Sequence, residues 1–331
     1  MTTPLRRGLP VVAIGGLAMI AATIGAPFVG STELHLGRVF SRSVPFATNV
    51  DAQIFFLARL PRALAAALVG GTLSAAGVVF QGLLRNPLAT PYTLGVSAGA
   101  ALGAMIAITF GAAWPVGGVA SASLAGALLA VLVVYALASA RHRGLSTTVL
   151  LLAGVTLNAF FSALILFVQY LSNFADTYRA LRWLMGDLDV ASYRPIVAAL
   201  PFVIGAFAAF AWLARPLNLL SLGAEAAGTR GVNVAHAQRV AFFSASVATG
   251  AAVSVGGPIG FVGIIIPHLV RLVVGADHRI VLPVSTFFGA AFLVVCDVVA
   301  RTAFTPLELP VGIITALIGG PFFLWLLLRR R

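Results

Sequence analysis

Ten stretches of the chain are apolar throughout, and most are long enough to cross a lipid bilayer. A transmembrane helix needs about 20 apolar residues to cross roughly 30 Å of hydrocarbon. Only the third and eighth stretches are shorter than this. We therefore expect an all-α, polytopic membrane protein with ten transmembrane helices, in a single domain that covers residues 1–331. The stretches lie at about 10–30, 57–81, 93–110, 115–138, 146–170, 195–214, 236–255, 260–274, 280–303 and 309–328.

The balance of charge supports this expectation and orients the chain. Only 9% of the residues are charged and 60% are hydrophobic, whereas soluble domains carry about 25% charged residues. Arg6 and Arg7 precede the first stretch, which we interpret as a retained helix rather than a signal peptide. With both termini in the cytoplasm, 13 of the 21 arginines lie inside, as the positive-inside rule requires.

Several classes of protein are excluded by residues that the chain lacks. All 21 basic residues are arginine, and without lysine neither a P-loop ATPase nor a Schiff-base enzyme is possible. Cys296 is the only cysteine, and the five histidines show no metal-ligand spacing. The net charge of +12 comes from arginines scattered between apolar stretches, which does not indicate nucleic-acid binding. We expect no enzyme, and any ATP hydrolysis must come from a partner.

Three polar segments are long enough to carry function. Residues 31–56 are external, and residues 171–194 are external and amphipathic, which predicts a short helix on the membrane surface. Residues 215–233 are cytoplasmic and should form one or two short helices. Within them, Leu222 to Gly228 (LGAEAAG) could seat in a groove of a soluble partner or form an ordinary interfacial loop.

Two interrupted stretches indicate an inverted repeat. NPLATP at 86–91 precedes the short third span, and GGPIGFVG at 256–263 precedes the short eighth span. Interrupted spans at matching places in two halves are typical of transporters with a central pathway.

Asp297 is the only carboxylate well inside a span. It lies four residues before Arg301, so the two can form an ion pair on one helix face. An ion-coupled secondary transporter usually keeps several ionisable groups at mid-depth. An ion-coupled secondary transporter is nevertheless kept as an alternative function for this chain.

Long blocks of sequence resemble one family of permeases, those of the ATP-binding-cassette (ABC) importers for iron–siderophore complexes, heme and cobalamin. The resemblance extends over nearly the whole chain. It rests on residues 59–77, 81–100 (QGLLRNPLATPYTLGVSAGA), 150–158, 183–188, 222–232, 257–271 (GPIGFVGIIIPHLVR) and 308–327.

The resemblance implies a set of partners and a location. It implies a homodimer in the bacterial inner membrane, with the ligand pathway at the two-fold axis between the subunits. Two ATPase subunits would bind the cytoplasmic face, and a periplasmic substrate-binding protein would deliver the ligand. This chain would hold no cofactor, because ATP and Mg²⁺ would be bound by the ATPase.

The resemblance also implies roles for particular residues, carried over position by position. Arg59, Arg62 and Arg301 would dock glutamates of the binding protein, and Asn86, Leu88, Ser146 and Thr147 would form the cytoplasmic gate. Leu151, Gly154, Thr156, Leu157, Phe160 and Phe161 would line the pathway. Leu219, Leu222, Gly223, Glu225 and Ala226 would contact the ATPase. Pro267, His268 and Arg271 match a family motif, in which we interpret His268 as structural rather than as a heme ligand.

Among the ligands of this family we favour heme. The external and pathway regions hold no dense polar lining for a hydrophilic siderophore, and the fifth span carries Phe160 and Phe161. Cobalamin and a ferric siderophore remain the alternatives.

Overall fold

The described part of the chain is built from helices joined by short connections, with no strand. The structure, a computed structural model, describes residues 4–41, 44–111, 118–139, 147–189 and 192–329. The long helices are α1 (Pro4–Gly25), α4 (Leu60–Leu84), α6 (Gly118–Ser139), α7 (Thr147–Tyr170), α9 (Arg194–Leu220), α11 (Val234–Gly256), α13 (His278–Thr302) and α14 (Val311–Arg329). The shorter ones are α2 (Leu36–Val39), α3 (Val50–Gln53), α5 (Val96–Thr109), α8 (Phe174–Leu184), α10 (Ala224–Thr229) and α12 (Val262–Val274).

A helix occupies each of the ten apolar stretches. Seven helical segments in the described residues are long and apolar enough to cross a membrane. Three further apolar helices, Val96–Thr109, Val262–Val274 and Val311–Leu326, are shorter. The third and eighth stretches are short, as predicted, while the count of ten complete spans stays a prediction.

Helix α4 lies at the centre of the packing. It contacts α13, α11, α12 and α9, and almost all of its residues are buried. Small side chains make this possible, because a Cβ atom on Gly77 would lie 2.0 Å from the carbonyl oxygen of Gly263. In lipid, helices associate through such close backbone contacts rather than through the hydrophobic effect.

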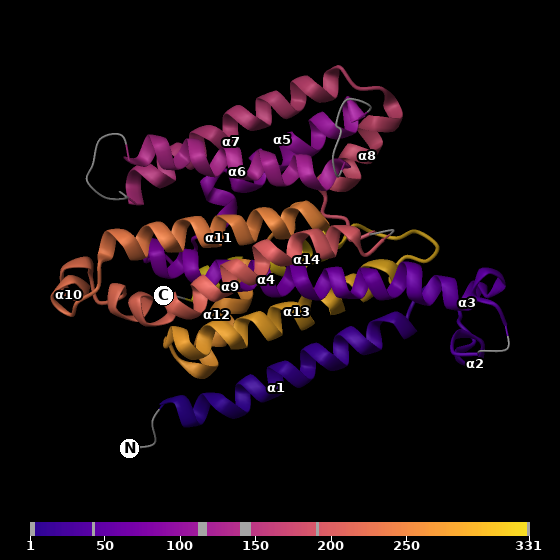
Figure 1. The fold of residues 1–331 in the computed structure, drawn as a ribbon, viewed down its shortest axis with the longest axis horizontal. Helices are drawn as coiled ribbons and strands as arrows, with labels where there is room; N and C mark the ends of the chain where they lie inside the picture. The colour runs from indigo at the N-terminus through magenta and orange to yellow at the C-terminus, as the bar shows by residue number, and fades with distance from the viewer. Residues whose placement is uncertain (1–3, 42–43, 112–117, 140–146, 190–191, 330–331) are drawn as a thin grey trace.

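The remaining helices pack around this centre in two groups. Figure 1 shows α5, α6, α7 and α8 together along one side and α1 on the opposite side. Helix α11 joins α5 and α6 to the centre, because it contacts both of them as well as α4 and α9.

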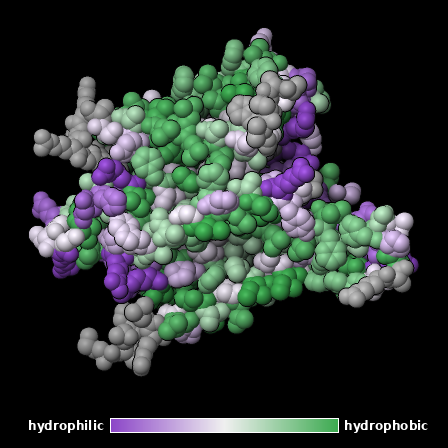
Figure 2. Space-filling view, in the orientation of Figure 1, coloured by the Kyte–Doolittle hydropathy of each residue, from purple (hydrophilic) through white to green (hydrophobic). Residues whose placement is uncertain are grey.

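The two ends of the molecule carry different elements. Helix α1 begins, and α14 ends, at the end that carries α10, whereas α2, α3 and α8 lie at the other end (Figure 1). In Figure 2 apolar side chains cover much of the middle of the visible face, and hydrophilic ones gather toward the two ends. We refer to the end of the molecule that carries α10 as the α10 end and to the opposite end as the α8 end.

Two predicted boundaries differ from the structure. The sixth span was expected to end near residue 214, but α9 continues through Pro216 to Leu220, because the loss of apolar residues marks the membrane edge and not the helix end. The second span was expected from residue 57. Helical structure instead starts at Val50 and passes through a π-helical turn, Ile54–Arg59 (η3), into α4.

Candidate functional site

The α8 end holds a buried cluster of arginines and carboxylates, in which all three predicted docking arginines take part. Arg62 Nε donates to Asp297 Oδ1 at 2.8 Å, and Arg62 Nη1 lies 2.5 Å from Glu308 Oε2. Arg301 Nε lies 3.6 Å from Asp297 Oδ2, so the ion pair predicted between Asp297 and Arg301 is confirmed. The cluster joins α4, α13 and the connection before α14.

Arg59 and Arg301 also bind backbone carbonyls. Arg59 donates to the carbonyl oxygens of Pro27 at 3.2 Å and Thr32 at 2.5 Å. Arg301 Nη2 donates to the carbonyl of Ala26 at 2.6 Å. Arg59, Arg62 and Arg301 are only 6%, 8% and 3% exposed, so a partner could reach them only through the hollow that they surround.

That hollow, which we call the arginine hollow, has a volume of about 460 Å³. Arg182 and Asp189 line it from the segment around α8, and Glu308 lines it from the connection before α14. Arg182 is partly exposed and pairs with Asp187 at 2.8 Å. With four arginines around it, the hollow suits a carboxylate, because guanidinium groups bind carboxylates in a bidentate way.

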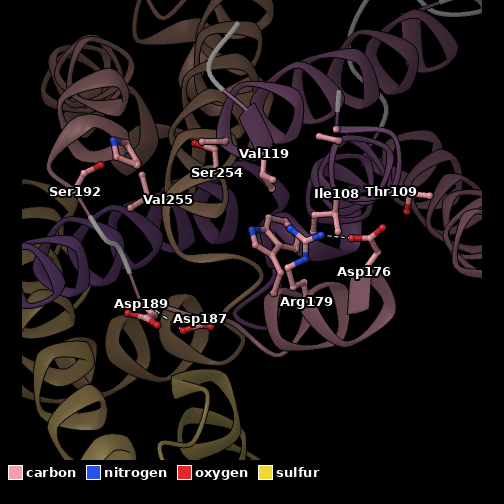
Figure 3. A pocket seen from close by; sticks show the side chains of 15 residues that line it. Ile108, Thr109, Val119, Asp176, Arg179, Asp187, Asp189, Ser192, Ser254 and Val255 are labelled. Carbon is pink, nitrogen blue, oxygen red and sulfur yellow. Dashed lines mark hydrogen bonds and ion pairs between the residues drawn. The ribbon is translucent and has the colours of Figure 1, made fainter. Parts of the chain in front are cut away.

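A second hollow at the same end measures about 750 Å³. Figure 3 shows Arg179 beside Asp176 on α8, with Asp187 and Asp189 set apart from that pair and Ser254 and Val255 contributed by the end of α11. This volume lies in the range of sites that hold small molecules. Sequence analysis predicted the amphipathic helix α8 but not that it borders a hollow.

At the α10 end the predicted coupling segment forms a single short helix after a turn. Residues 215–220 complete α9, and α10 starts after Gly223, whose φ of 116° needs glycine. Leu222 is 59% exposed and Glu225 is exposed, whereas Leu219 and Ala226 are half-buried. An exposed leucine beside a short helix gives a soluble partner a surface to bind.

A polar network that the sequence analysis missed ties the end of α9 to the start of α13. Asn218 Nδ2 donates to Asp277 Oδ1 at 2.7 Å, and Asn218 Oδ1 accepts from the backbone N–H of His278 at 2.8 Å. Hydrogen bonds from Arg279 lower the pKa of Asp277 to about 2. The only local signal is Asp277 itself, a favoured N-cap residue directly before an apolar run.

The predicted gate and pathway residues lie around α7 and the connection after α4. The side chain of Asn86 accepts from the N–H of Leu88 at 2.9 Å, and Leu88 is 42% exposed. Ser146 lies outside the described residues, and Thr147 is the first residue of α7.

Of the predicted pathway residues on α7, some face outward and some are packed. Phe160 is 56% exposed and Thr156 is exposed, Leu151 and Leu157 are half-buried, and Phe161 is 7% exposed. Gly154 lies against the backbone of η4 (Pro91–Leu94), since a Cβ there would be 2.4 Å from the carbonyl oxygen of Thr93. The roles of these residues stay predictions.

The two interrupted segments meet in the interior, a relation that the sequence did not reveal. Tyr92 Oη donates to the carbonyl of Ile259 at 2.5 Å, and Gln81 Nε2 donates to the carbonyl of Gly263 at 3.1 Å. Arg271, from the motif around His268, donates to the side chain of Gln81. The bonds from Tyr92 and Gln81 satisfy backbone carbonyls of the second interrupted segment, as a membrane interior requires.

Comparison with known proteins places the chain in a family. Residues 17–329 match the model of the FecCD transport family. The chain belongs to this family. The cobalamin import system permease protein BtuC of Halobacterium salinarum is 44% identical over 336 residues, covering 97% of this chain and 89% of the relative.

Further relatives agree with this assignment. The hemin transport system permease protein HmuU of Yersinia pestis is 37% identical over 321 residues, covering 95% of this chain and 94% of the relative. A solved inward-facing conformation of a metal-chelate type ABC transporter has a TM-score of 0.83 and 32% identity, covering 97% of this chain and 99% of that one.

Membership of the FecCD family confirms the central expectations from the sequence. The chain is a multi-pass membrane protein and the permease subunit of an ABC importer, and separate ATPase subunits hydrolyse the ATP. The family also implies a substrate-binding partner.

Proposed function

We propose that this permease works as a homodimer in the bacterial inner membrane and imports heme, or else cobalamin or a ferric siderophore, from periplasm to cytoplasm. The observation that carries the proposal is the FecCD match over residues 17–329, together with the distinct surfaces at the two ends of the molecule. The α8 end would face the periplasm and the α10 end, with both termini, the cytoplasm.

The pathway would lie between the exposed faces of α7 and α14 and the same faces of a second copy. Leu152, Val155 and Phe160 are exposed on α7, and Leu317 and Ile318 are exposed on α14. Such apolar faces allow a large ligand to pass without binding tightly.

The partners would act at opposite ends. Closure of the ATPase dimer on ATP, with Mg²⁺, would move Leu222 and α10, and the attached spans would rock to change access. The binding protein would present carboxylates to the arginine hollow.

Two observations point to different ligands. The exposed ring of Phe160 on α7 favours heme, as the aromatic fifth span did in the sequence. The higher identity to the cobalamin permease, 44% against 37% for the hemin permease, favours cobalamin. A ferric siderophore is the third candidate.

Reconstitution tests the function directly. The chain is placed in proteoliposomes with its ATPase and binding protein, and uptake of hemin, cyanocobalamin and a ferric siderophore is compared. We expect uptake of one of them only with ATP and both partners. Uptake driven by an ion gradient, with this chain alone and no ATP, would instead establish a secondary transporter.

Docking is tested separately with a matched pair of arginines. Arg59→Gln should weaken binding of the binding protein to the permease, because it removes a guanidinium from the arginine hollow. Arg38→Gln changes an exposed external arginine that does not line the hollow and should leave the affinity unchanged. Equal affinities for both variants, at equal thermal stability, would refute docking at the hollow.

A further inference from the structure

The two interrupted segments enclose a small hollow inside the membrane-embedded part of the protein. It has a volume of about 180 Å³ and lies between Tyr92 of η4, Leu73 of α4, and the stretch from Gly260 to Ile264. Non-helical backbone at membrane depth occurs only where it is buried in protein or lines a cavity. Here it lines a cavity, because Gly260 and Phe261 border the hollow, and a Cβ on Gly260 would point into open space.

Phe261 borders this hollow in an unusual backbone conformation. It precedes α12 with φ of 68° and ψ of −31°. A positive φ on a bulky residue is a true outlier, because the side chain clashes with the backbone. The other non-glycine residue of this kind in the described chain, Arg85, ends α4, where left-handed residues are common. Strained residues of this type concentrate at ligand clamps and switches.

The ring of Phe261 rests directly on the backbone of α14. A Cβ on Gly319 would lie 2.3 Å from Cγ of Phe261 and 2.5 Å from its Cβ. Only glycine therefore leaves room for the ring. The ring is half-buried, and on the same helix Leu317 and Ile318 are 65% and 46% exposed, so Phe261 contacts a helix that is partly uncovered in this chain.

We propose that Phe261 is a gating residue of the translocation pathway, whose ring closes the hollow while it rests on Gly319 and leaves that position when the pathway opens. The inference rests on the proposed transport function and adds a specific residue to it. A strained conformation persists only while its surroundings hold it. If α14 moves relative to α12 during the transport cycle, the contact at Gly319 is lost, and residue 261 relaxes and carries its ring away.

A ring that only packs between helices would give different experimental results from a ring that gates the pathway. If Phe261 only fills space between α12 and α14, its removal lowers stability and leaves the coupling of transport to ATP hydrolysis unchanged. If it gates the pathway, its removal lets solutes pass without ATP. Leakage and coupling therefore separate the two roles.

Phe288 on α13 provides a matched control. Its ring also rests on a glycine, because a Cβ on Gly15 of α1 would lie 3.0 Å from Cε2 of Phe288. Phe288 lies within a regular helix and does not line the hollow. Phe288→Ala thus removes an equivalent packing contact and no gate.

The experiment uses the complete importer in proteoliposomes that contain carboxyfluorescein. Wild type, Phe261→Ala, Phe261→Leu, Gly319→Ala and Phe288→Ala are compared for dye leakage without ATP, hemin or cyanocobalamin imported per ATP hydrolysed, and unfolding temperature. We expect Phe261→Ala and Gly319→Ala to leak and to import less ligand per ATP, because one removes the ring and the other displaces it. Phe261→Leu should show a smaller change in leakage and coupling, and Phe288→Ala should change neither.

Two results would overturn the gate. One is wild-type leakage and coupling in both Phe261→Ala and Gly319→Ala; the other is a loss of stability alone, equal to that of Phe288→Ala. If Phe261→Ala fails to assemble, Phe261→Leu and Gly319→Ala decide in the same way. Wild-type uptake is the positive control: if it fails for hemin, cyanocobalamin and a ferric siderophore, the proposed function fails, whereas the gate fails only against a working wild type.

Discussion

Arg62 Nε lies 2.8 Å from Asp297 Oδ1, although the two residues are 235 positions apart in the sequence. Both side chains are buried, and the pair joins α4 to α13. A buried ion pair contributes little net stability, but the loss of one partner leaves an uncompensated charge in a medium of low dielectric constant. The contact between α4 and α13 therefore depends on both side chains, because the loss of either one destabilises it.

Arg62→Met should lower the free energy of unfolding by roughly 3–5 kcal/mol, because Asp297 stays buried and loses its hydrogen-bonded arginine, while Arg301 Nε lies 3.6 Å away. The double variant Arg62→Met/Asp297→Leu should recover part of that loss. Thermal unfolding in detergent measures both.

Arg182→Met is the control for this prediction. Arg182 pairs with Asp187 at 2.8 Å, but its side chain is 39% exposed, so the change should cost less than about 1 kcal/mol. Equal shifts in unfolding temperature for Arg62→Met and Arg182→Met would contradict our account of the cluster.

Gly77→Ala should separate α4 from α12. The added Cβ would lie 2.0 Å from the carbonyl oxygen of Gly263. This oxygen belongs to the backbone, so the clash can be relieved only by moving one helix away from the other. We expect a lower unfolding temperature and a lower yield of folded protein. Gly16→Ala on α1 adds a Cβ with no atom within 4 Å and should behave like wild type, so equal behaviour of the two variants would show that this contact does not limit packing.

The sequence predicted those features of the fold that the lipid environment determines. Apolar stretches located the spans, and the alternation of polar and apolar residues located α8, because lipid leaves the chain few other choices. The pair Asp297–Arg301 was also predictable, since residues four apart share a helix face. The FecCD family and the separate ATPase followed from long motifs and from the absence of lysine.

Contacts between distant segments were not predictable. Arg62 was expected to face a partner protein, and nothing local indicated that Asp297 and Glu308 already bind it. The bond from Tyr92 to Ile259 and the positive φ of Phe261 likewise depend on how two interrupted segments meet in space. A single sequence shows which residues are neighbours on one helix, but not which helices are neighbours.

Leu222→Ala should weaken binding of the ATPase and reduce ATP-driven uptake. Leu222 is 59% exposed in the turn before α10, so its side chain is free to fill a groove in a partner. Leu137→Ala, on the side of α6, removes a leucine that is 52% exposed and lies outside the coupling segment. Co-purification of the ATPase with each variant measures the effect, and equal recovery would place the ATPase contact elsewhere.

Asp277 should stabilise the start of α13 across the physiological pH range. Its carboxylate caps the helix by accepting from the N–H of Arg279 at 3.0 Å and also binds the Arg279 side chain. Asp277→Ala should cost about 0.5–2 kcal/mol, the usual value for a lost N-cap. Asp277→Asn keeps a capping oxygen and loses the charge, so it should cost less.

The pH dependence follows from the lowered pKa of Asp277. Hydrogen bonds from Arg279 bring this pKa to about 2, below the value of about 3.9 in an unfolded chain. The charged carboxylate therefore contributes its full stability above about pH 4 and loses it as the pH falls toward 2. The difference in unfolding temperature between wild type and Asp277→Asn should be constant from about pH 5 to 8. A difference that changes within that range would mean that another titrating group, and not the Asp277 carboxylate, controls this end of α13.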